Sequence, residues 1–206
     1  MKIGPRYKIC KRLGSSVFEK CQTQKFMLSE ARSGSTRKKK GGFRGRSDYG
    51  SQLLEKQKAR LTYGLTEKQF SKYVKEAMEK SGEDSSIGLT TKLETRLDNV
   101  AFRFGFAKTR RQARQLVSHG HITVGGRKVT IPSYHVQQGD EVAVRTESRE
   151  SPLFLAAKEG ALERVLPTWL RVKEGDALSG VVKELPRLSE PERSFNPAVV
   201  IQFYSR

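Results

Sequence analysis

The chain has few cysteines and histidines, and their scarcity argues against several kinds of site. Its 206 residues include 2 Cys and 3 His, and Cys10 and Cys21 lie far from His119, His121 and His135. A structural zinc site typically takes four ligands in two close pairs, and a disulfide framework needs more cysteines. We therefore expect reduced structural thiols and no cofactor, with a zinc site completed from elsewhere in the chain as the alternative.

Long apolar runs are also missing. No stretch approaches the roughly 18 consecutive apolar residues of a spanning helix, and residues 1–20 are basic and lack the apolar run of a secretory signal. None of the histidines has a Cys nucleophile, or a metal-type pairing with Asp or Glu, nearby in sequence. We expect a cytoplasmic protein with no membrane contact, no small-molecule substrate and no enzymatic activity.

Acidic residues are scarce relative to basic ones. Lys and Arg number 40 against 22 Asp and Glu, which gives a net charge of +18 and a pI near 10.1. The charge is segregated, because residues 1–46 carry +12 and residues 93–145 carry +5. Residues 47–92 carry +1, and residues 146–206 are neutral. Such a footprint favours a polyanionic partner, since each cation set against a phosphate releases counterions.

Residues 1–46 end in a stretch that is rich in glycine and in positive charge. The glycines and the repulsion between like charges predict an extended basic arm, which orders when phosphates neutralise it. The alternative is a disordered basic tail or an import signal. The residues of this segment expected to contact RNA are Arg6, Lys8, Lys11, Arg12, Arg37, Lys38, Lys39, Lys40, Arg44 and Arg46.

Residues 47–92 are expected to form a small helical domain, joined by residues 195–206. Ser47 is a plausible cap for a first helix, and Thr66 followed by Gln69 is a capping box for a second. The apolar stripe that begins at Phe70 is interpreted as core. The expected RNA contacts here are Tyr49, Lys56, Lys58 and Arg60.

The pattern of residues 93–150 predicts two basic helices packed on a small, mainly antiparallel sheet. The expected fold class is therefore α+β. One helix follows the stripe from Leu93 to Phe104, and Thr109 caps the next. The period then changes to two, with a hairpin turn at Gly125-Gly126. The expected RNA contacts are Arg96, Asn99, Arg103, Lys108, Thr109, Arg110, Arg111, Arg114, Gln115, His119, His121, Arg127 and Lys128.

The C-terminal segment is the least informative part of the chain. Residues 151–194 are expected to form a helix and a connecting segment. Alternation of Val199, Ile201 and Phe203 predicts a final strand that packs back onto the domains.

Several motifs occur in an order that resembles a known family. Residues 96–106 and 109–122 resemble the alpha-L RNA-binding module. Together with Ser47-Asp-Tyr-Gly50, Tyr63-Gly64 and Pro167-Thr-Trp-Leu170, they resemble the bacterial-type small-subunit ribosomal protein four family over almost the whole chain.

This resemblance implies a primary rRNA-binding protein of the small ribosomal subunit. It implies binding at a helical junction of the 5′ domain, nucleation of body assembly, and a contribution to accuracy. The implied partners are small-subunit rRNA, neighbouring proteins of the universal five and twelve families, and mRNA near its path into the ribosome. The location would be ribosome-bound in a bacterial cytoplasm, with an organellar ribosome also possible.

Two other function classes can use the same module. An RNA-modifying enzyme, such as a pseudouridine synthase, would need a catalytic domain with a buried Asp, and the remaining residues leave little room for one. A free RNA-binding stress protein would not need the N-terminal arm and the helical domain.

Overall fold

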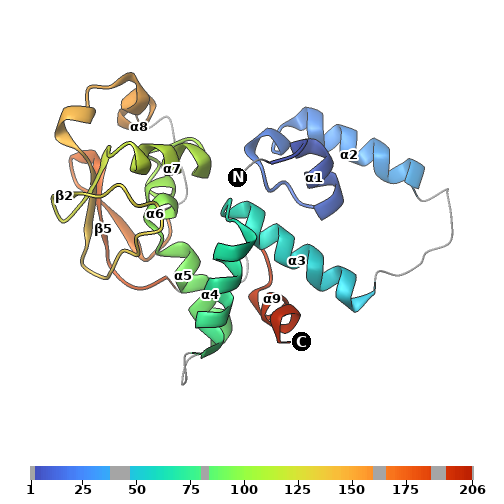
Figure 1. Cartoon of the computed structure of the whole chain (residues 1–206). Coiled ribbons are helices and arrows are strands. Elements are labelled where there is room, and N and C mark those ends of the chain that lie inside the picture. Colours follow the sequence, from blue (N-terminus) through green and yellow to red (C-terminus); the bar gives the residue numbers. More distant parts are fainter. Residues whose placement is uncertain (1–2, 38–46, 80–83, 160–165, 187–193, 206) are drawn as a thin grey trace. The chain divides into compact units, whose positions relative to one another are not determined.

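The structure is a computed structural model. It describes residues 3–37, 47–79, 84–159, 166–186 and 194–205. The chain divides into a helical unit, residues 1–86 and 190–206, and a sheet unit, residues 87–189 (Figure 1). The α+β class predicted from the sequence is confirmed.

The helical unit begins with α1 (Arg6–Leu13), the 3-10 turn η1 (Glu19–Cys21) and α2 (Gln24–Arg37). Buried Cys10, Phe18, Cys21 and Phe26 form a small core between them. The expectation of an extended arm was therefore wrong over residues 3–37. The prediction gave too much weight to charge repulsion and too little to these apolar side chains, whose burial offsets it. Residues 38–46 lie outside the described residues.

The rest of the helical unit consists of α3 (Asp48–Thr62), α4 (Glu67–Glu79) and α9 (Pro197–Tyr204). Two predicted caps are confirmed, since the Ser47 hydroxyl accepts from the Gly50 amide at 3.2 Å and the Thr66 hydroxyl accepts from the Gln69 amide at 3.3 Å. Helix α9 contacts both α3 and α4. The C-terminal residues thus complete the core of a unit whose other helices lie much earlier in the chain.

Helix α9 replaces the predicted C-terminal strand, which was wrong. Oδ1 of Asn196 accepts from the amides of Ala198 and Val199 at 3.0 and 3.4 Å, and Pro197 occupies the first turn. Asn at the cap and Pro at the first helical position are strong start signals. They outweigh a short alternation of apolar residues, which also fits a helix that is apolar on most sides.

The sheet unit contains most of α5 (Ser85–Glu94), then α6 (Leu97–Arg103), α7 (Arg110–Ser118), β1 (Ile122–Val124), β2 (Arg127–Lys128), β3 (Glu141–Val144), η2 (Thr146–Ser148), η3 (Pro152–Phe154), α8 (Leu155–Lys158), β4 (Leu170–Lys173) and β5 (Asp176–Val182). Among the described residues, five strands form one antiparallel sheet in the order β2-β1-β3-β5-β4. Strands β4 and β5 lie where only a helix and a connecting segment were expected, so this part of the prediction was incomplete.

The helix expected from Leu93 to Phe104 is broken between α5 and α6. Arg96 is extended, with φ −62° and ψ 135°, and forms a β-bridge with His135. The Leu97 amide donates to the carbonyl of Tyr134 at 2.8 Å. Backbone pairing with a segment almost forty residues away thus interrupts a continuous apolar stripe.

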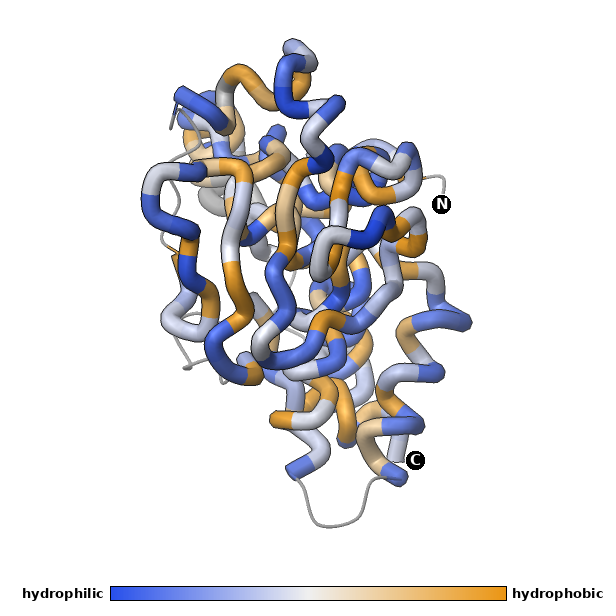
Figure 2. Tube along the Cα trace, turned by 90° about the vertical axis from the view of Figure 1, so that its left-hand side faces the viewer, coloured by the Kyte–Doolittle hydropathy of each residue, from blue (hydrophilic) through white to orange (hydrophobic). Residues whose placement is uncertain are grey.

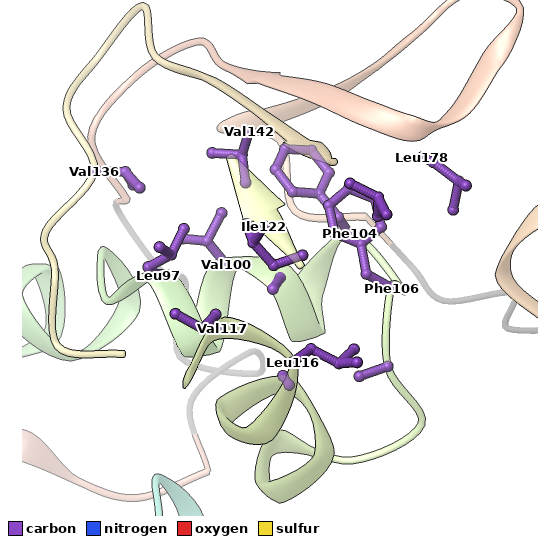
Figure 3. Packing of buried hydrophobic residues seen from close by; sticks show 14 of the residues in the cluster. Leu97, Val100, Phe104, Phe106, Leu116, Val117, Ile122, Val136, Val142 and Leu178 are labelled. Atoms are coloured by element: carbon purple, nitrogen blue, oxygen red, sulfur yellow. The ribbon is translucent and has the colours of Figure 1, made fainter. Parts of the chain in front are cut away.

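The core of the sheet unit lies where α6 and α7 pack on the sheet. Leu97, Val100, Leu116 and Val117 face Ile122 and strand β3 (Figure 3). Hydrophobic and hydrophilic residues alternate along the chain in this unit (Figure 2). Each fully buried aliphatic side chain contributes about 1.5–3 kcal/mol to the stability of the fold. Burial of these side chains therefore holds α6 and α7 firmly on the sheet.

Candidate nucleic-acid interface

Helix α7 carries four of the predicted RNA contacts, three of which are arginines. Its cap is as predicted, since the Thr109 hydroxyl accepts from the Gln112 amide at 3.0 Å. Arg111 is exposed, and Arg110 and Arg114 are partly exposed. The opposite face of the helix is buried in the core, so the backbone that carries the arginines is fixed. Guanidinium groups on a fixed backbone suit phosphate recognition, because their fork matches the phosphate oxygens.

Asp98 of α6 holds one of these arginines. Nε and Nη2 of Arg114 lie 2.8 and 2.7 Å from Oδ2 of Asp98. Nε and Nη2 of Arg96 donate to Oδ1 and Oδ2 of the same carboxylate at 3.0 and 2.7 Å. A buried carboxylate is thus shared between a buried and a partly exposed guanidinium.

A second network lies beside the first. Oδ1 of Asn99 accepts from Nε of Arg110 at 2.8 Å, and Nδ2 of Asn99 donates to Oε2 of Glu94 at 2.8 Å. Arg103 donates to both carboxylate oxygens of Glu94 at 3.0 and 2.8 Å. The guanidinium of Arg110 also lies 4.3 Å from the centre of the Phe102 ring, within the range of a cation–π contact.

Two predicted RNA contacts are corrected by this geometry. Arg96 is 1% exposed and Asn99 is 2% exposed, so both side chains bind protein groups inside the unit. A buried guanidinium needs a carboxylate partner, and sequence reasoning overlooked that Asp98 provides it. Glu94 was overlooked as well. Two acids four residues apart in an otherwise basic segment were the available signal.

The predicted histidines lie at the corner between α7 and β1. His119 is exposed, and its ring is stacked with that of His121 at 6.2 Å. Nδ1 of His121 lies 2.9 Å from the Ser148 hydroxyl. Burial lowers the pKa of His121 below its usual 6.5, and the charges of His119, Arg145 and Lys128 lower it further. The corner is therefore electropositive, and Arg145 belongs to it although sequence reasoning did not select it.

The remaining predicted contacts of the sheet unit are at its surface. Lys108 and Gln115 are exposed at α7, and Arg127 and Lys128 are exposed on the β1–β2 hairpin. The Lys128 side chain lies against Gly120. The hairpin cation and the histidine corner are therefore close in space, as a continuous phosphate-binding surface requires.

Two predicted cations of the helical unit surround an acid. Nζ of Lys56 lies 2.7 Å and Nε of Arg60 3.3 Å from the carboxylate of Glu67. The Tyr204 hydroxyl donates to the same carboxylate at 2.8 Å. Burial raises the pKa of Glu67, but the hydrogen bonds of Lys56 and Tyr204 and the charges of the two cations lower it overall. Lys58 pairs with Glu55 at 3.5 Å.

The N-terminal cations are less closely grouped. Lys8 and Arg12 are exposed on α1, and Nζ of Lys11 donates to the Ser29 hydroxyl at 3.0 Å. The guanidinium of Arg6 lies 5.8 Å from the Phe18 ring, and Tyr49 is half exposed on α3. The side chain of Arg37 is not described, and Lys38, Lys39, Lys40, Arg44 and Arg46 lie outside the described residues.

The two cysteines are buried together in the N-terminal core. Both are free thiols, and Sγ of Cys21 lies 3.8 Å from the carbonyl of Arg6. Burial and the adjacent Cys10 raise the pKa of Cys21 to about 12, so it is a protonated thiol at neutral pH. Within the described ranges, no three His, Cys, Asp or Glu residues gather as metal ligands would. No described helix is long and apolar enough to cross a membrane.

The fold and this surface define a class of protein. Two helices packed on an antiparallel sheet, with arginines held along one of them, form a nucleic-acid-binding module of the alpha-L type. The S4 domain matches residues 95–142, and the ribosomal protein S4/S9 N-terminal domain matches residues 1–94.

Curated relatives identify the family. The small ribosomal subunit protein uS4 of Roseiflexus castenholzii is 47% identical over 208 residues, which cover 99% of this chain and 98% of the relative. Those of Persephonella marina and Natranaerobius thermophilus are 45% and 40% identical, each over 98% of both chains. The chain belongs to the uS4 family, as its motif order predicted. This is a family of structural, non-enzymatic proteins, so the RNA-modifying-enzyme alternative is set aside.

Proposed function

We propose that this protein is a structural constituent of the small ribosomal subunit that binds small-subunit rRNA directly. The observation that carries the proposal is the α7 surface, where Arg110, Arg111 and Arg114 are presented from a helix fixed in a core. Such a surface contacts RNA phosphates without having to fold first, which suits a protein that binds rRNA early.

The finer parts of the role rest on the family resemblance. The protein binds a helical junction of the 5′ domain, nucleates assembly of the body and contributes to translational accuracy. It does so beside proteins of the universal five and twelve families and near the path by which mRNA enters the ribosome. The histidine corner and the hairpin extend the basic surface of the sheet unit, and the cations of α1 and α3 supply basic groups in the helical unit.

Sedimentation of the full-length protein with small subunits tests the proposal. We expect it to co-sediment with small subunits in high salt, and to protect a defined junction of 5′-domain rRNA from chemical cleavage when the two are mixed. Protein found only in the free pool, with no protected rRNA, would contradict the proposed function.

A further inference from the structure

Two consecutive residues of α6 each contact one arginine of α7. Asp98 binds Arg114, and Asn99 binds Arg110. The two arginines are four residues apart, so they lie one helical turn apart on the same face. Their partners face them from α6, which packs against α7.

The burial of these groups is graded from the core outward. The Asp98 side chain is 4% exposed and that of Arg96 is 2% exposed, whereas that of Arg114 is 31% exposed. Arg96 and Asp98 therefore form a buried ion pair, and the Arg114 side chain extends from this pair to the surface. In the neighbouring network Glu94 is fully buried and Arg103 is 21% exposed.

We propose that Asp98 and Asn99 are positioning residues, which hold Arg114 and Arg110 as a preformed pair of phosphate-binding groups. This inference rests on the proposed function, because the phosphates belong to rRNA. A long cationic side chain loses rotamer freedom when it is ordered. When a buried partner orders the guanidinium during folding, less of that loss falls on the binding step.

Phosphate is the ligand class that this geometry favours. The guanidinium offers five N–H donors in one plane, and Asp98 lies against the Nε and Nη2 side of Arg114. Asn99 is neutral, so it orients Arg110 without reducing the positive charge of the surface. Both guanidinium groups stay charged because arginine does not lose its proton in proteins, and their α6 partners fix the orientation of the guanidinium planes.

A purely structural role for Asp98 predicts a different effect on RNA binding. In that case Asp98 only neutralises buried Arg96, and its loss would affect stability alone. An acid near a phosphate-binding surface also repels phosphates, so its removal would strengthen binding. A positioning role predicts the opposite sign, because the loss of order at Arg114 outweighs the loss of repulsion.

A double-mutant cycle on the full-length protein separates these roles. The probe is a 5′-domain fragment of small-subunit rRNA, titrated by filter binding with wild type, Asp98→Asn, Arg114→Ala and the double variant. We expect Asp98→Asn to weaken binding about tenfold, and to change it less than about twofold when Arg114 is already alanine. The matched control is Glu147→Gln, which removes an exposed acid paired with Arg145 and should leave binding equal or tighter.

Equal weakening by Asp98→Asn in both backgrounds, or tighter binding, would overturn the positioning role. If Asp98→Asn does not fold, Arg114→Lys replaces it, because lysine keeps the charge but lacks the planar fork. We expect about a fivefold loss of affinity from Arg114→Lys, and less than about twofold from Arg171→Lys on β4, which lies outside the proposed interface. Equal losses would overturn the inference. Absence of rRNA binding by the wild type would instead contradict the proposed function itself.

Discussion

The hydroxyl of Tyr204 donates a 2.8 Å hydrogen bond to Oε1 of Glu67, a residue 137 positions earlier in the chain. The bond joins α9 to the start of α4. Nζ of Lys56 lies 2.7 Å from the same Glu67 oxygen. Burial raises the pKa of Tyr204 above its usual value, and the Glu67 hydrogen bond raises it further. The C-terminal helix is therefore fixed to the helical unit by a neutral donor and a charged acceptor.

Tyr204→Phe should lower the stability of the helical unit. Loss of a hydrogen bond to a charged group costs about 1.5–3 kcal/mol, and partial exposure places this one at the lower end. Urea unfolding followed by circular dichroism measures the change. The control is Tyr7→Phe, since Tyr7 is 51% exposed and its ring stacks on that of Phe26. Equal losses from the two variants would contradict the importance of the Glu67 contact.

Gly180→Ala should destabilise the sheet unit. A Cβ at this position of β5 would overlap the Phe104 ring, which is itself stacked on Phe106 at 5.4 Å. Overpacking of a rigid core costs about 1–3 kcal/mol. The single tryptophan, Trp169, is buried in this unit, and its fluorescence during urea unfolding reports the change.

A second substitution checks the cause of that loss. Phe104→Leu removes the ring that the new methyl group would meet, so the double variant should be less destabilised than the two single losses predict. Strict additivity would show that the ring does not cause the effect of Gly180→Ala.

Local signals were sufficient for much of the fold. The caps at Ser47, Thr66 and Thr109, the stripe of α4 and the hairpin turn were each visible within a few residues. Strands β4 and β5 were not, because the segment of β5 becomes a strand through pairing with β3, 36 to 40 residues earlier, and β4 in turn pairs with β5. Long-range pairing of this kind leaves little trace in a local pattern.

The RNA contacts themselves stay a prediction, but the placement and the burial of the side chains can be compared with what the sequence indicated. Arg110, Arg111 and Arg114 were grouped correctly on one helix. Arg96 was assigned to the surface because a continuous helix places it opposite the apolar stripe. The helix breaks at that residue, and the side chain turns inward onto Asp98. Sequence spacing alone cannot show such a break, since it depends on the backbone of residues 134–136.

The sheet unit should be less stable in mild acid than at neutral pH, because of His121. Its pKa is lowered in the folded state, while in the unfolded chain it is near 6.5. The unfolded state therefore binds more protons below about pH 6.5, and stability present above that pH is lost as pH falls through the folded pKa. Urea midpoints followed by Trp169 fluorescence between about pH 8 and pH 5 measure this trend.

His121→Gln should flatten that dependence, because glutamine does not titrate. The control is His135→Gln, which changes an exposed histidine near Thr95 and should retain the wild-type trend. An equal slope in wild type and His121→Gln would show that other groups cause the acid sensitivity.

Arg110→Ala combined with Arg114→Ala should reduce both the affinity for rRNA and its dependence on salt. Each phosphate contact contributes about 0.7–0.9 to the slope of log affinity against log salt concentration. Loss of two contacts should lower the slope by roughly two at most. Filter-binding titrations of the 5′-domain fragment at several salt concentrations measure it.

The matched control removes the same charge from another surface of the same unit. Arg171 and Lys173 are exposed cations on β4, paired with Glu174 and Glu141. Arg171→Ala with Lys173→Ala should leave the slope nearly unchanged, because these residues lie outside the proposed interface. An equal fall in slope for both double variants would mean that net charge alone governs binding. An unchanged slope for the α7 variant would reject this helix as the electrostatic contact with rRNA.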